Sequence, residues 1–122
     1  MKILTTRHFS KWAKKQKVST DNLATAAEEV RNGNYEANLG GNVIKKRMPF
    51  HGKGKRGGIR TIIFYKQHDK LIFVHGFQKN EQSDISDAEL KGFKELAKIF
   101  MSMSEHQFQH GIKIGNFMEI VK

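Results

Sequence analysis

Clustered cations in the middle of the chain are the residues whose types and spacing could do chemistry. Residues 45–60 carry seven Lys or Arg side chains, and no acid lies between Glu36 and Asp69. Four glycines in the same run leave backbone N–H groups free to approach a phosphate closely. Because the like charges of such a run repel one another unless an anion neutralises them, these residues predict contact with the phosphates of a nucleic acid.

The spacing of these cations divides them between strands and a loop. Lys45 and Arg47 lie two residues apart and therefore share one face of a strand. Arg60 opens the next strand-like run, and Lys79 follows the third, so paired strands would place all four on one surface. Lys46 falls on the opposite, apolar face, where we expect it near the sheet edge with its stem reaching water. The loop cations predicted to contact RNA at the rim of this surface are Lys53, Lys55 and Arg56.

The surrounding sequence argues against a dinucleotide site and against a metal site. Residues 52–57 fit the pattern G-x-G-x-x-G, but a strand-like run follows where a dinucleotide site needs a helix. The chain has no cysteine, and its closest histidine pair, His106 and His110, lacks the glutamate of a zinc helix. We therefore expect neither a metal nor a cofactor. His75, near the end of the third strand, is assigned to RNA contact, although a histidine at a strand end can equally serve structure.

Apolar spacing predicts the elements that position these cations. A helix over residues 7–17 has Phe9 and Trp12 on one face, and a second helix follows a cap near Ser19. Residues 38–42 are predicted as a polar loop. Ser86 and Glu89 match a capping box, which begins a helix that runs to about residue 103. A short helix and a terminal strand around residues 117–120 are expected after it.

Three β-rich runs, at residues 43–48, 59–66 and 71–77, predict consecutive strands, with a short opening strand near Ile3. The second and third runs contain continuous apolar stretches, so the sheet should be covered on both faces or strongly curved. The predicted fold class is α+β, in which a small antiparallel sheet carries an N-terminal helical hairpin and a C-terminal helix. One domain is expected over residues 1–122.

Composition limits the classes of function. The chain of 122 residues has a net charge of +10, which indicates a polyanionic partner. No apolar stretch approaches the roughly 18 residues of a membrane helix, and the start lacks the long apolar core of a signal peptide. A cytoplasmic protein without membrane contact is therefore expected.

The chain resembles the RelE-like toxins of bacterial toxin–antitoxin systems, within the wider RelE/ParE superfamily. The likeness is carried by Lys45-Lys46-Arg47, by the run GKGKRGGIR at residues 52–60, and by Lys79-Asn80-Glu81. It implies the RelE-like, microbial ribonuclease-type fold. It also implies a metal-independent endoribonuclease that cuts messenger RNA, most often in the ribosomal A site, and so inhibits translation. A cognate antitoxin is implied as a partner, frequently a helix-turn-helix protein, and the charge predicts an acidic segment that covers the cations.

The resemblance maps the family's catalytic cations onto Lys45, Arg47, Arg60 and Lys79. Arginine stays protonated and suits phosphate clamping, so Arg47 and Arg60 are expected to hold the transition-state charge. Lys45 or Lys79 would transfer protons, since packed cations lower one another's pKa. Several relatives carry a tyrosine a few residues beyond the last cation, and here that register holds Ser86. Tyr35 and Tyr65 lie outside it.

Two alternatives remain open on sequence grounds. A ParE-like gyrase poison would share the fold without needing a cationic groove. A non-catalytic RNA- or ribosome-binding domain would account equally well for the basic charge.

Overall fold

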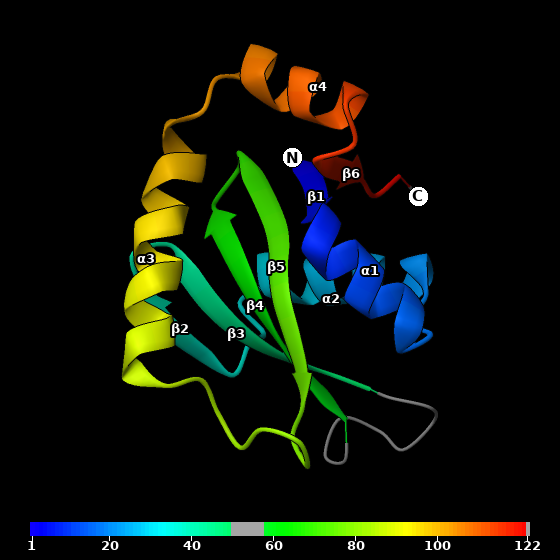
Figure 1. The fold of residues 1–122 in the computed structure, drawn as a ribbon, viewed down its shortest axis with the longest axis vertical. Coiled ribbons are helices and arrows are strands. Elements are labelled where there is room, and N and C mark those ends of the chain that lie inside the picture. Colours follow the sequence, from blue (N-terminus) through cyan, green and yellow to red (C-terminus); the bar gives the residue numbers. More distant parts are fainter. Residues whose placement is uncertain (50–57, 122) are drawn as a thin grey trace.

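The computed structural model describes residues 1–49 and 58–121, which form a sheet flanked by helices (Figure 1). The strands are β1 (Lys2–Thr6), β2 (Ala37–Gly40), β3 (Val43–Met48), β4 (Ile59–Lys66), β5 (Lys70–Gln78) and β6 (Phe117–Glu119). The helices are α1 (Arg7–Lys15), α2 (Thr20–Arg31), α3 (Asp87–Ser102) and α4 (Glu105–Lys113). This arrangement confirms the α+β class.

The described strands follow the order β2-β3-β4-β5-β1-β6 across the sheet. β2 to β5 are antiparallel neighbours, as predicted for the three central strands. β1 lies between β5 and β6 and runs parallel to β5. The sheet is therefore mostly antiparallel with one parallel pair, which the sequence did not predict. The opening strand finds its partner some seventy residues along the chain, and no local signal marks that pairing.

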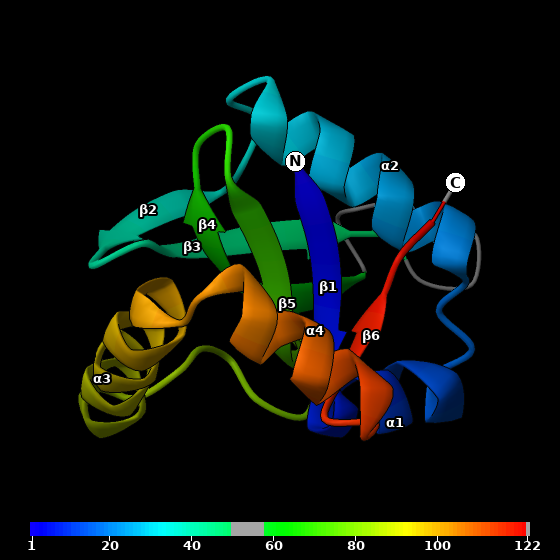
Figure 2. The ribbon, with the colours of Figure 1, turned by 90° about the horizontal axis from the view of Figure 1, so that it is seen from above.

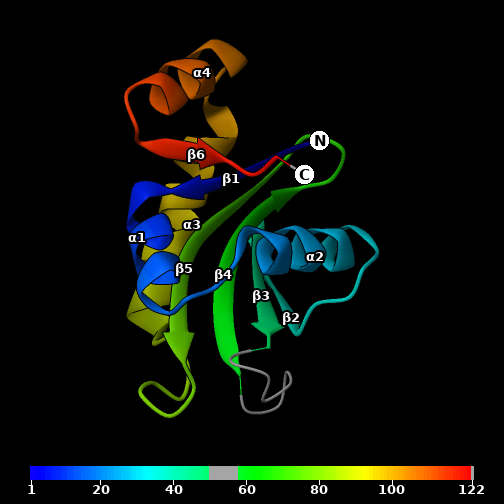
Figure 3. The same ribbon diagram turned by 90° about the vertical axis from the view of Figure 1, so that its right-hand side faces the viewer.

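Helices cover both faces of the sheet, which explains the continuous apolar runs in β4 and β5. Figures 2 and 3 show α2 on one side of the strands and α3 on the other. Phe9 of α1 and Val30 of α2 share a buried cluster with Ile63 and Phe73. The second buried cluster lies on the other face and joins α3, α4 and β6 to the sheet; its buried members include Ile62, Phe64, Ala97, Phe108 and Phe117.

Serine side chains begin three of the helices. The Ser86 hydroxyl accepts from the Glu89 backbone N–H at 3.1 Å, and the Glu89 carboxylate accepts from the Ser86 N–H at 2.9 Å. This confirms the capping box predicted from the sequence. Ser104 and Gln107 form the same box at α4, whereas Ser19 caps α2 only by accepting from the Asn22 backbone N–H. None of the described helices is long and apolar enough to cross a membrane.

The prediction of a loop over residues 38–42 is wrong in part. Residues 37–40 form β2, and only residues 41 and 42 make the turn into β3. The Glu36 backbone N–H donates to the Lys45 carbonyl at 2.9 Å and extends this pairing toward the preceding chain. The free edge of β3 supplies the hydrogen-bond partners, so a polar and glycine-containing segment becomes a strand despite its low β propensity.

The expectation that Lys46 reaches water at the sheet edge is also wrong. β2 occupies that edge, so β3 is an internal strand and the Lys46 side chain is only 2% exposed. Its Nζ lies 2.8 Å from Glu29 Oε1 of α2 and donates to the Asn34 carbonyl at 2.9 Å. A buried ammonium requires such partners because burial without them is costly.

A β-bulge aligns His75 with the cationic face of the sheet. Ile62 is paired with His75, whereas Ile63 is paired with Phe73, so Val74 is an additional residue on β5. Lys45 is paired with Ile62 in turn. Lys45, Ile62 and His75 therefore form one row across β3, β4 and β5 on the face that α3 covers.

Candidate active site

Strand register brings three of the predicted catalytic cations together. Arg47 on β3 lies directly opposite Arg60 on β4, and Lys45 is two residues before Arg47 on the same face. Successive side chains of a strand alternate between faces, so all three point to the α3 side of the sheet. They lie at the end of the hairpin from which residues 50–57 depart. The structure thus assembles Lys45, Arg47 and Arg60 in one place.

Glu36, which sequence reasoning did not select, lies at the centre of these cations. Its carboxylate is 3.4 Å from Lys45 Nζ and 2.9 Å from Arg60 Nε, and it also pairs with Arg47 Nε. Burial raises the pKa of Glu36, but the hydrogen bond from Arg47 and the charges of Arg60 and Lys45 outweigh it and hold the pKa below its ordinary value. We call these four residues the Glu36 cluster.

Asp84 adds a second carboxylate to the site. It accepts from Lys45 Nζ at 3.1 Å and from the Ile85 backbone N–H at 2.8 Å. Although burial opposes ionisation, these two contacts lower the pKa of Asp84. Asp84 precedes α3, whose first turn carries Asp87 and Glu89. Three cations therefore face two carboxylates, and the site is less positive than the sequence suggested.

Arg60 has a buried hydrogen-bond donor without a partner among the described residues. Its side chain is 4% exposed, and Nη1 is buried with no partner among the described residues. Unsatisfied buried polar atoms are uncommon in native structures and often mark functional positions. A phosphate oxygen reaching Nη1 would satisfy it with a charge-assisted hydrogen bond.

Lys79 follows β5 at the same end of the sheet. Gln78 is paired with Ile59, so Lys79 leaves the sheet beside the start of β4. The side chain is exposed and forms no ion pair with a described residue. Lys79 is thus close to the hairpin end but outside the Glu36 cluster.

His75 packs among aromatic rings. Its ring centroid lies 5.4 Å from that of Phe93 and 6.1 Å from that of His8, which is stacked on it. Burial lowers the pKa of His75, the neighbouring His8 lowers it further, and Glu89 opposes both. The imidazole is therefore neutral at neutral pH, and RNA contact by His75 stays a prediction.

The remaining predicted residues divide into those outside the described chain and those used elsewhere. Lys53, Lys55 and Arg56 lie outside the described residues. Tyr35 and Tyr65 pack against the buried apolar cluster on the face of the sheet that α1 and α2 cover. They therefore point away from Lys45. In the described part of the chain, no group of His, Cys, Asp and Glu side chains could hold a metal ion.

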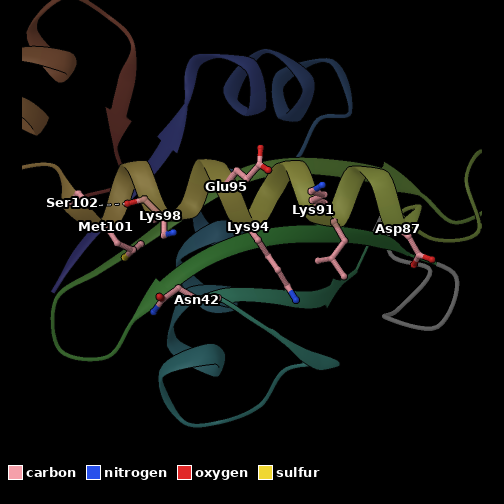
Figure 4. Close-up of a pocket in the computed structure, with 10 residues that line it drawn as sticks. Asn42, Asp87, Lys91, Lys94, Glu95, Lys98, Met101 and Ser102 are labelled. Atoms are coloured by element: carbon pink, nitrogen blue, oxygen red, sulfur yellow. Dashed lines mark hydrogen bonds between the residues drawn. The ribbon is translucent and has the colours of Figure 1, made fainter.

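A groove of about 680 Å³ runs between α3 and the turn at residues 41–42, and it contains none of the predicted site residues. Figure 4 shows Lys94 reaching from α3 toward the β2–β3 hairpin. Asp87 and Glu95 line the groove together with lysines, so its charges are mixed in sign. It therefore differs from the Glu36 cluster, where cations predominate.

Replacing Glu36 with glutamine is expected to destabilise the fold in a pH-dependent manner. The folded-state pKa of Glu36 is lowered, so its ionisation stabilises the fold above the ordinary pKa of 4.5, and this contribution is lost as the pH falls through the folded-state pKa. We expect Glu36→Gln to lower the free energy of unfolding by about 1 kcal/mol at neutral pH. The difference from wild type should vanish in acid. Urea unfolding at several pH values measures it.

Glu95→Gln, on the exposed face of α3, controls for the change in net charge. A loss in Glu36→Gln that is equal at every pH would contradict the assignment, because a purely steric defect does not follow ionisation.

Comparison with known families places these features in context. A family model described as the RelE toxin of the RelE/RelB toxin–antitoxin system matches residues 1–120. A search of curated proteins gives no match. The match spans the Glu36 cluster, both faces of the sheet and Lys79.

Proposed function

The chain belongs to the RelE toxin family and is a toxin of a toxin–antitoxin system, and on that premise we propose that it is a metal-independent endoribonuclease. Its substrate is messenger RNA, cleaved in the ribosomal A site, and the consequence is arrest of translation in the cytoplasm. Toxins of this family are generally ribonucleases. The observation that carries the proposal is the Glu36 cluster, in which Nη1 of the buried Arg60 has no hydrogen-bond partner in the described part of the chain.

The chemistry of such a cleavage assigns roles to the cluster. The 2′-oxygen attacks phosphorus and loses its proton, the phosphorane gains negative charge, and the bond to the 5′-oxygen breaks as that oxygen takes a proton. Arg60 and Arg47 are placed to neutralise the phosphorane, because guanidinium groups remain charged and donate in pairs to phosphate. Proton transfer is assigned to Lys45 or Lys79.

Glu36 is assigned to positioning. Its lowered pKa makes the carboxylate a weak base, so it is poorly suited to take the 2′-proton. It instead holds Lys45, Arg47 and Arg60 in one constellation before substrate arrives. A phosphate entering the cluster competes with Glu36 for these donors, and Arg47, whose side chain is 44% exposed, offers the first contact.

Membership of the family implies a cognate antitoxin as partner. We infer that this antitoxin is a helix-turn-helix protein with an acidic segment that covers the cationic surface. The net charge of +10 supports an acidic partner.

Primer extension on a reporter message after induction tests the proposal directly. Wild type is expected to produce defined cuts within translated codons. Lys79→Ala should reduce them about tenfold, equivalent to about 1.4 kcal/mol of transition-state stabilisation. Lys66→Ala is a matched control, because Lys66 is exposed and lies at the opposite end of the β4–β5 hairpin.

Two outcomes would replace the proposal. Intact message together with blocked DNA supercoiling would indicate a gyrase poison. Ribosome binding with steep salt dependence and intact message would indicate a non-catalytic RNA-binding protein.

A further inference from the structure

α1 carries an unusually one-sided charge. Residues 1–20 contain six Lys or Arg side chains and no acid, since the first acid of the chain is Asp21. Five of these cations are exposed on α1 and its C-terminal extension and form no ion pair with a described residue: Arg7, Lys11, Lys14, Lys15 and Lys17. In α3, by contrast, lysines alternate with Asp87, Glu89 and Glu95, which is typical of a solvated helix.

Stability does not account for this pattern. Like charges three or four residues apart on a helix, such as Lys11 and Lys15, destabilise it by about 0.2–0.5 kcal/mol per pair. The first turn of α1 contains no acid, and Arg7 and His8 stand where negative charge would favour the dipole. Lys14 and Lys15 lie in the last turn, where positive charge favours the helix dipole, but helix stability does not explain Arg7 in the first turn or the repulsion between Lys11 and Lys15. This suggests that the cations of α1 serve a ligand.

An aromatic ring lies among these cations. His8, Lys11, Trp12, Lys14 and Lys15 line a shallow groove of about 500 Å³, which we call the α1 surface. One side of Trp12 is packed so closely on Gly76 that a Cβ at that position would lie 2.2 Å from the ring. Trp12 also contacts Phe9, with ring centroids 5.5 Å apart, and the half-buried indole lines the groove with the part that remains. Cations around a fixed aromatic ring form the usual platform for single-stranded nucleic acid, because bases stack on the ring and lysines bind the phosphates.

The α1 surface lies beside the strand that leads to the candidate active site. α1 packs along β5 (Figures 1 and 3). The ring of His8 stacks on that of His75, and Gln78 Nε2 donates to Gln16 Oε1 at 2.6 Å. Lys79 follows Gln78 directly. A strand of RNA held near Lys79 could thus continue along α1.

We propose that the α1 surface binds a single-stranded segment of RNA outside the cleaved phosphate. The inference rests on the proposed function only in taking RNA as the polyanion. Trp12 supplies stacking, and Lys11 and Lys15, which are neighbours one turn apart beside it, supply phosphate contacts.

The test uses the full chain and a 2′-O-methylated single-stranded RNA of about 12 nucleotides, a length that a single-strand groove spans. This RNA lacks the attacking hydroxyl and stays intact. Trp12 is the only tryptophan, so its fluorescence reports on the α1 surface alone. We expect the RNA to quench it. In Lys11→Gln/Lys15→Gln, the slope of log affinity against log salt should fall in magnitude by about 1.4, because two phosphate contacts are lost.

Lys91→Gln/Lys98→Gln is the matched control, since it removes the same charge from the mixed-sign groove on α3. The proposal is overturned if both double variants bind alike, or if RNA leaves the fluorescence of Trp12 unchanged. Primer extension decides the proposed function separately. If message is cleaved but RNA binding does not involve the α1 surface, only this inference is rejected. If RNA binds at the α1 surface but message stays intact, only the proposed ribonuclease activity is rejected.

Discussion

Replacing Arg60 with alanine is expected to lower the rate of message cleavage at least about tenfold, or about 1.4 kcal/mol. Arg60 is the buried cation of the Glu36 cluster, and its Nη1 has no partner among the described residues, so we expect it to meet charge that develops on the phosphorane. Primer extension with matched amounts of folded protein measures the effect.

Stability must be measured alongside activity, because Arg60 also binds Glu36. Hydrogen bonds to charged groups contribute about 1.5–3 kcal/mol, and Arg60→Ala should lose a comparable amount of unfolding free energy. Arg60→Lys separates the two roles. It keeps the charge beside Glu36 but removes the planar fork, so it should recover most of the stability and little of the cleavage. Full activity per folded molecule in Arg60→Ala would show that the assignment is wrong.

Replacing Lys46 with alanine should have the largest effect on stability, a loss of at least about 3 kcal/mol. The change removes the ion pair with Glu29 and the hydrogen bond to the Asn34 carbonyl, and it leaves a cavity beneath α2. Urea unfolding followed by Trp12 fluorescence measures the loss. Cleavage per folded molecule should stay near wild type, because Lys46 faces away from the Glu36 cluster.

Lys66→Ala again provides the control. Lys66 is exposed and its contact with Asp69 is a surface pair at 3.6 Å, so the change should stay within about 0.5 kcal/mol. Lys46→Met, which keeps the volume but not the charge, asks whether the ion pair itself stabilises the fold. Equal unfolding free energies for Lys46→Ala and Lys66→Ala would contradict the prediction.

The position of Glu36 changes how the site is expected to meet RNA. The sequence suggested an unopposed run of positive charge, whereas three of its cations are held by carboxylates of the same chain. Such a cluster is ordered before substrate binds, and ordered donors lose less freedom on contact with a phosphate. Attraction over longer distances then falls to unpaired cations such as Lys79 and those of α1.

The sequence by itself determined the local features of this protein. The caps at Ser19 and Ser86 and the three central strands were predicted correctly, as were α4 and the terminal strand. These features depend on neighbours within a few residues, either through a side chain that bonds its own helix or through alternation along one strand. The shared face of Lys45 and Arg47 follows from the same alternation.

Only the tertiary structure decided what those cations contact. Glu36 meets Arg60 through the pairing of β2, β3 and β4, and Asp84 reaches Lys45 across thirty-nine residues of chain. The burial of Lys46 depends on β2 occupying the sheet edge. Ion pairs, strand order and burial are set by residues far apart in sequence, and a pattern read along one segment carries no information about its distant partners.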